Sequence, residues 1–122
     1  MFKFEELRTY HEAIEFVSEV YKLTKKWPKE EIFGLTNQLR RASVSISLNI
    51  AEGSSRKQKD FMHFLDMSRG SVFECVSIII IAKNQMYITE KEYETLRTKC
   101  LTLAKMISKL KTSLTKYEPK TN

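Results

Sequence analysis

The chain has 122 residues, a net charge of +6 and only three glycines and two prolines, which suits a single domain of long helices. No apolar run approaches the ~18 residues that cross a membrane, and with the acidic Glu5 and Glu6 near the N-terminus we expect no secretory signal there. We therefore expect a cytoplasmic protein without a membrane partner, in which Cys75 and Cys100 stay reduced. Residues 85–122 hold eight basic and four acidic residues, an excess that permits an anionic partner.

The first helix is expected to run from about Tyr10 to Trp27. Thr9 and Glu12 have the spacing of a capping box, in which each side chain accepts a hydrogen bond from the other residue's backbone N–H. Pro28 disfavours a helical residue before it, so the helix should end there.

The remaining helices follow from similar signals. The second should run from about Gly34 to Glu52, with Gly53 as the residue that follows its end, since glycine is common just after a helix. Ser55 and Gln58 have capping-box spacing and would start the third helix. A further capping box, Thr89-x-x-Glu92, would start the fourth. The third and fourth helices are then expected at residues 56–84 and 90–117.

Apolar residues recur every three or four positions along these helices, as they do in helical bundles. Because the connections between the long helices are short, the pattern predicts an all-α, antiparallel up-and-down four-helix bundle, with residues 1–122 as one domain. The predicted seam of the second helix is Ile32, Leu35, Leu39, Ala42, Ile46, Asn49 and Gly53. That of the last helix is Tyr93, Leu96, Cys100, Leu103, Ile107, Leu110, Leu114 and Tyr117.

Three of the helices carry more apolar residues than one seam needs. A helix that is apolar on two faces is buried on two sides, and in a small bundle the second side is often a subunit contact. The alternative is a wide core with a few exposed hydrophobic residues. The residues expected at the subunit contact are Phe16, Val20, Trp27, Val44 and Leu48.

Four polar residues occupy places that the helical pattern assigns to the core or its edge, namely Asn49, Glu52, Ser71 and Glu74. Such groups mainly satisfy one another, so we expect a structural polar network. A polar binding site is the alternative.

Residues that could carry catalysis or bind a metal are not found in a productive pattern. A di-metal bundle needs two Glu-x-x-His motifs, whereas this chain offers only Asp60-x-x-His63. Cys75 and Cys100 fall on core seams, without a histidine placed to activate them. There is no P-loop and no dinucleotide-binding glycine motif. We expect neither an enzyme nor a metal or cofactor.

Basic residues gather in several stretches that could bind phosphates. The last helix has a stripe of lysines, and another group crosses the turn between the second and third helices. Such stripes are usually solvated helix faces, but in an oligomer they would repeat and multiply phosphate contacts. The residues expected to contact nucleic acid are Arg40, Arg41, Arg56, Lys57, Lys59, Lys105, Lys109 and Lys116.

The central block Gln38-Leu39-Arg40-Arg41-Ala42-Ser43, followed by Ser45-Ile46 and Asn49-Ile50-Ala51-Glu52-Gly53, resembles the signature of the bacterial four-helix-bundle proteins that include the ribosomal RNA intervening-sequence proteins. Phe61, Phe64-Leu65, Gly70-Ser71 and Glu74 are similar to that family as well.

This resemblance implies a homopentamer without catalytic residues. A related branch, the accessory protein of diversity-generating retroelements, is strongly basic and binds nucleic acid and a reverse transcriptase. The charge of +6 is moderate by comparison, which argues against that role for this chain.

Three hypotheses for the function follow. The first is a homopentameric protein that binds RNA or DNA, as an accessory factor to an RNA or reverse-transcriptase complex. The second is a protein-interaction scaffold with incidental basic charge. The third is an enzyme with a site among Asn49, Glu52, Ser71 and Glu74.

Overall fold

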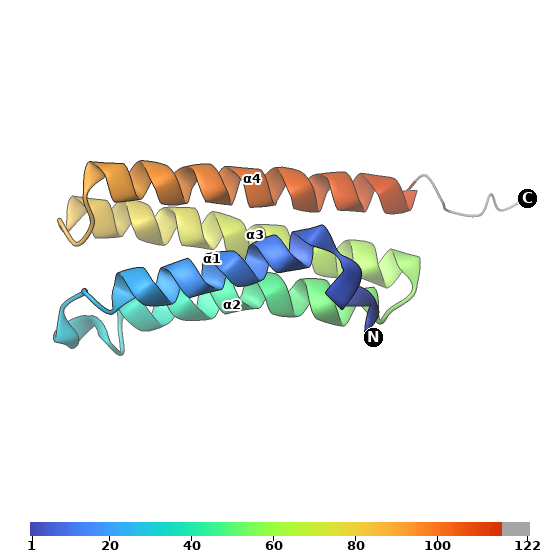
Figure 1. Ribbon diagram of the computed structural model, residues 1–122, viewed down its shortest axis with the longest axis horizontal. Coiled ribbons are helices and arrows are strands. Elements are labelled where there is room, and N and C mark those ends of the chain that lie inside the picture. Colours follow the sequence, from blue (N-terminus) through green and yellow to red (C-terminus); the bar gives the residue numbers. More distant parts are fainter. Residues whose placement is uncertain (116–122) are drawn as a thin grey trace, which may run out of the picture.

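The computed structural model describes residues 1–115, and these residues are helical with no strand. Four α-helices lie side by side in an elongated bundle (Figure 1): α1 (Arg8–Thr24), α2 (Leu35–Ser54), α3 (Gln58–Asn84) and α4 (Glu90–Thr115). Two short 3-10 helices, η1 (Lys3–Glu6) and η2 (Lys29–Glu31), precede α1 and α2. The all-helical fold with four helices is as predicted.

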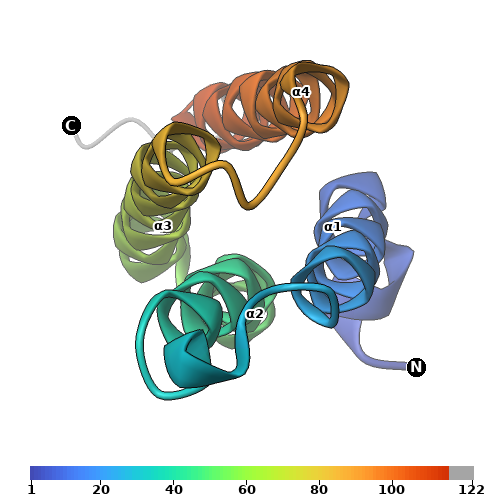
Figure 2. The ribbon, with the colours of Figure 1, turned by 90° about the vertical axis from the view of Figure 1, so that its left-hand side faces the viewer.

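The connections alternate between the two ends of the bundle. Figure 1 shows the α1–α2 and α3–α4 connections at one end, and the N-terminus and the α2–α3 turn at the other. Seen from the end, the helices stand at four corners, with α1 opposite α3 and α2 opposite α4 (Figure 2). Side-chain contacts join neighbouring helices: the Ser68 hydroxyl of α3 donates to the Ile46 carbonyl of α2 at 2.8 Å, and Lys99 of α4 pairs with Glu19 of α1.

The core runs along the middle of the bundle and draws side chains from all four helices. Phe16, Ile46, Leu65 and Ile107 are among its largest fully buried residues. The predicted seam of α4 is confirmed, because its described residues from Tyr93 to Leu114 are buried in the core or packed against it. No helix among residues 1–115 is long and apolar enough to span a membrane.

The predicted seam of the second helix needs two corrections. Ile32 precedes α2 and is 54% exposed, so it does not belong to the core. Asn49 is only partly buried, and its neighbour Ile50 is fully buried instead. Leu39, Ile46 and Ile50 are the residues of α2 that face the core. Asn49 precedes Ile50 by one residue, and its side chain therefore points about 100° away from that direction.

Two of the three predicted capping boxes are wrong. Thr9 lies inside α1, which begins at Arg8, and its side chain is buried. Ser55 follows the end of α2, where its hydroxyl donates to the Glu52 carbonyl at 2.7 Å; the helix start belongs to Lys57. The first helix also ends earlier than predicted, at Thr24, and Trp27 reaches the core from the turn that follows.

The capping box at the start of α4 is confirmed. The Thr89 backbone N–H donates to Glu92 Oε1 at 2.9 Å, and the Glu92 N–H donates to Thr89 Oγ1 at 3.0 Å. These bonds satisfy two backbone donors, one of them in the first turn of the helix.

The prediction that α2 ends just before Gly53 is wrong, because the helix continues to Ser54 and no described glycine has a positive φ. The role of Gly53 is to allow close packing. A Cβ atom at this position would lie 2.7 Å from Phe64 Cβ and 2.8 Å from Phe61 Cδ1 on α3.

Candidate nucleic-acid and self-association surfaces

The α2–α3 turn and the first turn of α3 carry three exposed basic residues, Arg56, Lys57 and Lys59, here called the turn cations. Arg56 is paired with Glu52 at 2.6 Å, and the hydrogen bond and charge of Glu52 raise the pKa of the Arg56 guanidinium. Lys57 immediately precedes α3, and no side chain caps that helix start. The turn cations therefore lie beside uncapped backbone N–H groups, which attract anions.

The exposed side of α4 carries the second basic group. Lys105 and Lys109 are exposed, lie one helical turn apart, and have no ion-pair partner within residues 1–115. Lys116, which was predicted to extend this stripe, lies outside the described residues. Figure 1 places the C-terminal part of α4 and the α2–α3 turn at the same end of the bundle.

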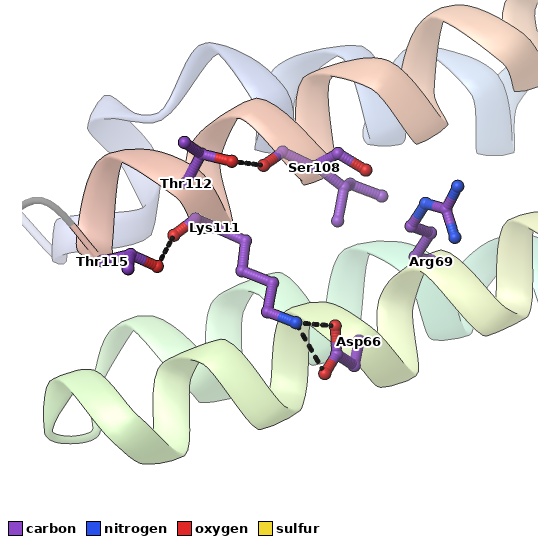
Figure 3. Close-up of a pocket in the computed structure, with 7 residues that line it drawn as sticks. Asp66, Arg69, Ser108, Lys111, Thr112 and Thr115 are labelled. Carbon is purple, nitrogen blue, oxygen red and sulfur yellow. Dashed lines mark hydrogen bonds and ion pairs between the residues drawn. The ribbon is translucent and has the colours of Figure 1, made fainter.

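Lys111 of α4 is directed elsewhere. Its Nζ atom contacts both carboxylate oxygens of Asp66 on α3, at 2.8 and 3.1 Å (Figure 3). The pair borders a shallow pocket of about 310 Å³ that Arg69 also lines. Because Asp66 compensates its charge, Lys111 adds less to the basic surface than Lys105 or Lys109.

Arg40 and Arg41 are not part of the same patch as the turn cations. Arg40 lies 14 positions before Ser54, the last residue of α2, which is a rise of about 21 Å, and Arg56 follows after that end. Arg40 is partly buried: its Nε atom donates to Thr24 Oγ1 at 2.9 Å, and its guanidinium lies 4.6 Å from the centre of the Tyr21 ring. Arg40 thus joins α2 to α1, whereas Arg41 is exposed.

The four residues of the predicted polar network are only partly brought together. Ser71 Oγ donates to Ser45 Oγ at 3.0 Å, and Asn49 Nδ2 donates to the same hydroxyl at 3.1 Å. Ser45 therefore bridges Ser71 and Asn49. Glu52 and Glu74 are exposed and do not belong to this network, since Glu52 turns to Arg56 instead.

Three of the predicted subunit-contact residues must be corrected. Phe16, Val20 and Trp27 are at most 6% exposed, because this stripe of α1 and the turn after it fill the core of the single chain. They leave no surface for another copy. Val44 is partly exposed and Leu48 is 61% exposed, so these two side chains are accessible to another copy.

An apolar surface remains on the outer side of α1 and α2. Arg40 of α2 lies over the Tyr21 ring of α1. Val44 and Leu48 follow Arg40 at steps of four residues and so lie on the same side of α2. Ile14 and Tyr21 are both about 40% exposed and lie two turns apart. We call these four residues, Ile14, Tyr21, Val44 and Leu48, the α1–α2 face.

A second apolar surface was missed by the sequence reasoning. A groove of about 320 Å³ between α3 and α4 is lined by Phe73, Val76, Ile80, Leu101 and Ala104, among others. Phe73 is 57% exposed, and Arg69 lies 4.8 Å from the centre of its ring. The spacing of Phe73, Val76 and Ile80 is a signal that could have identified this stripe. We call it the α3–α4 groove.

The family model of the 23S rRNA-intervening sequence proteins matches residues 5–109. The chain belongs to the 23S rRNA-intervening sequence protein family. A solved structure from Bacteroides thetaiotaomicron, described as a protein with unknown function from the S23 ribosomal protein family, has the same fold: the TM-score is 0.78 at 21% identity, over 84% of this chain and 97% of that chain. No curated protein matches the chain.

The two cysteines of this family member are placed for packing. Cys75 and Cys100 are free and fully buried. Burial raises the pKa of both thiols, that of Cys100 to about 12, because the charged thiolate loses its hydration. Nucleophilic chemistry needs a thiolate, so these surroundings suppress it. Within residues 1–115 no cluster of three or more His, Cys, Asp or Glu could hold a metal ion.

Proposed function

We propose that this protein is a non-enzymatic homo-oligomer that binds nucleic acid through the turn cations and the α4 lysines. The observation that carries the proposal is the presence of two neighbouring lysines, Lys105 and Lys109, on α4. Both are exposed, and neither forms an ion pair with an acidic residue among residues 1–115. When unpaired lysines neutralise phosphates, the cations condensed on the nucleic acid are released. This release is the main source of sequence-independent affinity for nucleic acids. We also expect it to act in the cytoplasm.

We infer an antiparallel up-and-down order for the helices. Ion pairs between the two neighbouring segments support it. Glu19 of α1 meets Lys99 of α4, and Lys26, just after α1, meets Glu92 of α4, so residue numbers rise along one segment as they fall along the other. This order sets the C-terminal part of α4 at the end where the α2–α3 turn lies, and so gathers the two basic groups.

Self-association is the second part of the proposal. The α1–α2 face and the α3–α4 groove belong to different pairs of helices, and Figure 2 shows the α1–α2 pair and the α3–α4 pair on opposite sides of the bundle. A contact between two different surfaces is heterologous, and such contacts close into rings when the rotation between copies permits. Five copies is the number implied by the resemblance of the sequence to pentameric bundle proteins. A ring would repeat the basic groups at one end.

The partner strand is proposed to be RNA or DNA. Membership in an rRNA-intervening sequence family supports an RNA setting, and an accessory role beside a reverse transcriptase is the other setting we consider.

A protein-interaction scaffold is the second candidate, and the α3–α4 groove favours it. The exposed Phe73, Ile80 and Leu101 would suit the apolar side of a partner helix. In that case the basic charge would be incidental.

Two measurements test the proposal on the unmodified protein. Light scattering after gel filtration should give a mass several times that of one chain. Titration with labelled single-stranded RNA and double-stranded DNA at increasing salt should give an affinity that falls linearly on a double logarithmic plot. Failure to bind either nucleic acid even at low salt would refute the nucleic-acid proposal, and a monomer would refute the ring.

A further inference from the structure

Three segments that are distant in sequence, residues 3–7, 54–61 and 110–114, line a cavity at the end of the bundle that carries the α2–α3 turn. Its volume is about 390 Å³, within the roughly 300–1,000 Å³ of typical small-molecule sites. Lys3 of η1, Arg56 of the turn, Gln58 and Phe61 of α3, and Leu110 and Leu114 of α4 line it. The cavity is separate from the α3–α4 groove and from the pocket beside Lys111.

The wall of this cavity is mainly apolar. Leu7, Phe61, Leu110 and Leu114 are partly buried, and all four pack against the main core. They form a surface supported from behind, to which a flat ring or a chain of methylene groups could bind. Apolar contact alone does not choose between these two kinds of ligand.

Two polar side chains that line the cavity, those of Gln58 and Glu6, favour a flat ring over a methylene chain. The side-chain Nε2 of Gln58 is buried without a hydrogen-bond partner among the described residues, which costs free energy unless a ligand or water meets it. Glu6 lines the same cavity with a carboxylate that can accept hydrogen bonds. An amide and a carboxylate together match a heterocycle whose edge carries both acceptors and donors, as a nucleobase does. A lipid chain would leave the Gln58 amide unsatisfied.

The mouth of the cavity is basic. Lys3 and Arg56 line it, and Lys57 and Lys59 flank Gln58 at the uncapped start of α3. Arg56 is engaged by Glu52, so the unpaired positive charge comes from Lys3, which lines the cavity, and from Lys57 and Lys59, which neighbour Gln58 in the sequence. A phosphate next to the base would meet this charge and the backbone N–H groups of the first turn.

We propose that the cavity binds one unpaired nucleotide of a bound strand, its base against Phe61 and the α4 leucines and its phosphate at the lysines. This inference rests on the proposed nucleic-acid binding and adds to it a preference for single-stranded or looped segments. Proteins that read single strands commonly pack bases against apolar and aromatic side chains in this way.

Nuclear magnetic resonance of the full chain tests the cavity directly, with the four ribonucleoside monophosphates as probes and ribose 5-phosphate as the probe without a base. We expect at least one nucleotide to shift the Gln58 side-chain amide and the methyl signals of Leu110 and Leu114. Ribose 5-phosphate should leave the methyl signals unchanged. Methyl signals that respond to no nucleotide, or that respond to decanoate alone, would overturn the proposal.

A matched pair of variants isolates the amide. Gln58→Met keeps the size of the side chain and removes its hydrogen bonds, and should weaken the preferred nucleotide about five- to tenfold, the worth of one hydrogen bond. Gln38→Met makes the same change at an exposed position of α2 and should have no effect. Equal weakening by both variants would contradict the cavity. A cavity-filling variant, Leu114→Phe, should block the nucleotide whether or not Gln58→Met folds normally.

The outcome also separates this inference from the proposed function. Salt-dependent binding of single-stranded RNA that is identical in the wild type and Gln58→Met, without methyl shifts, would remove the cavity and leave the proposed function intact. Nucleotide shifts without any binding of RNA or DNA strands would refute the proposed function, and with it the assignment of the cavity to a bound strand.

Discussion

The Cβ position of Gly53 on α2 lies 2.7 Å from Phe64 Cβ on α3, closer than two such carbons can approach. Gly53→Ala should therefore force α2 and α3 apart and lower the free energy of unfolding by about 1–3 kcal/mol, although alanine is the better helix former. Urea unfolding followed by circular dichroism measures the change.

Gly70 provides the matched control. It lies in the middle of α3, and nothing is within 4 Å of its Cβ position. Gly70→Ala should raise the free energy of unfolding by about 0.5–1 kcal/mol, since only the backbone preference changes. The same sign of effect at both glycines would contradict the close approach at Gly53.

The capping box of α4 should contribute measurably to stability. Thr89→Ala removes the hydroxyl that accepts the Glu92 N–H, and should cost about 0.5–2 kcal/mol. Thr98→Ala, on the exposed side of the same helix, is the control for the loss of a threonine side chain and should not destabilise the protein.

Glu92 makes stability depend on pH. The Thr89 backbone N–H and the nearby Lys26 lower the pKa of its carboxyl group, so the charged form favours the folded state. That contribution is present above the unfolded pKa of about 4.3 and disappears as the pH falls through the lower folded value. Glu92→Gln, which keeps an acceptor and loses the charge, should be less stable than the wild type at pH 7. The difference should shrink at pH 3, and a constant difference in urea unfolding would be the contrary result.

The buried thiols should be unreactive in the folded protein. Since burial raises the pKa of Cys75 and Cys100, we expect almost no reaction with a disulfide reagent at pH 8. Both should react at once in urea. Fast labelling of the folded chain would show that the core opens far more readily than its packing implies.

Charge reversal tests the nucleic-acid surface. Lys105→Glu with Lys109→Glu should weaken RNA binding and reduce the salt slope by about 1.4 for single strands if each lysine meets one phosphate. Lys22→Glu with Lys25→Glu makes the same change of net charge on exposed residues at the C-terminal end of α1, and should have a smaller effect. Equal effects would mean that only net charge matters.

Substitutions on the two apolar surfaces test the ring. Leu48→Glu and Phe73→Glu each place a charge where a neighbouring copy would bury an apolar group, and each should shift the protein toward monomers in light scattering. Phe33→Glu is the control, because Phe33 is 93% exposed before α2 and belongs to neither surface. An unchanged mass for both surface variants would exclude these contacts.

Local signals in the sequence were enough for the number and approximate extent of the helices. The Thr89 and Glu92 box and the α4 seam depend on residues within a few positions of one another, so they could be predicted without knowing the rest of the chain. The same reasoning failed at Thr9, where the hydroxyl residue is buried within the helix, and at Ser55, which follows the preceding helix.

What the tertiary structure decided is which side of each helix is covered. The first helix has two apolar stripes, and only the packing of three other helices determines that Phe16 and Val20 face the core while Ile14 and Tyr21 remain partly exposed. The cavity around Gln58 likewise draws on three segments that are far apart in the sequence. By itself the sequence determined the all-helical class and the local helix signals, because these depend on neighbours along the chain. The surfaces proposed for self-association and nucleotides arise only where separate helices meet.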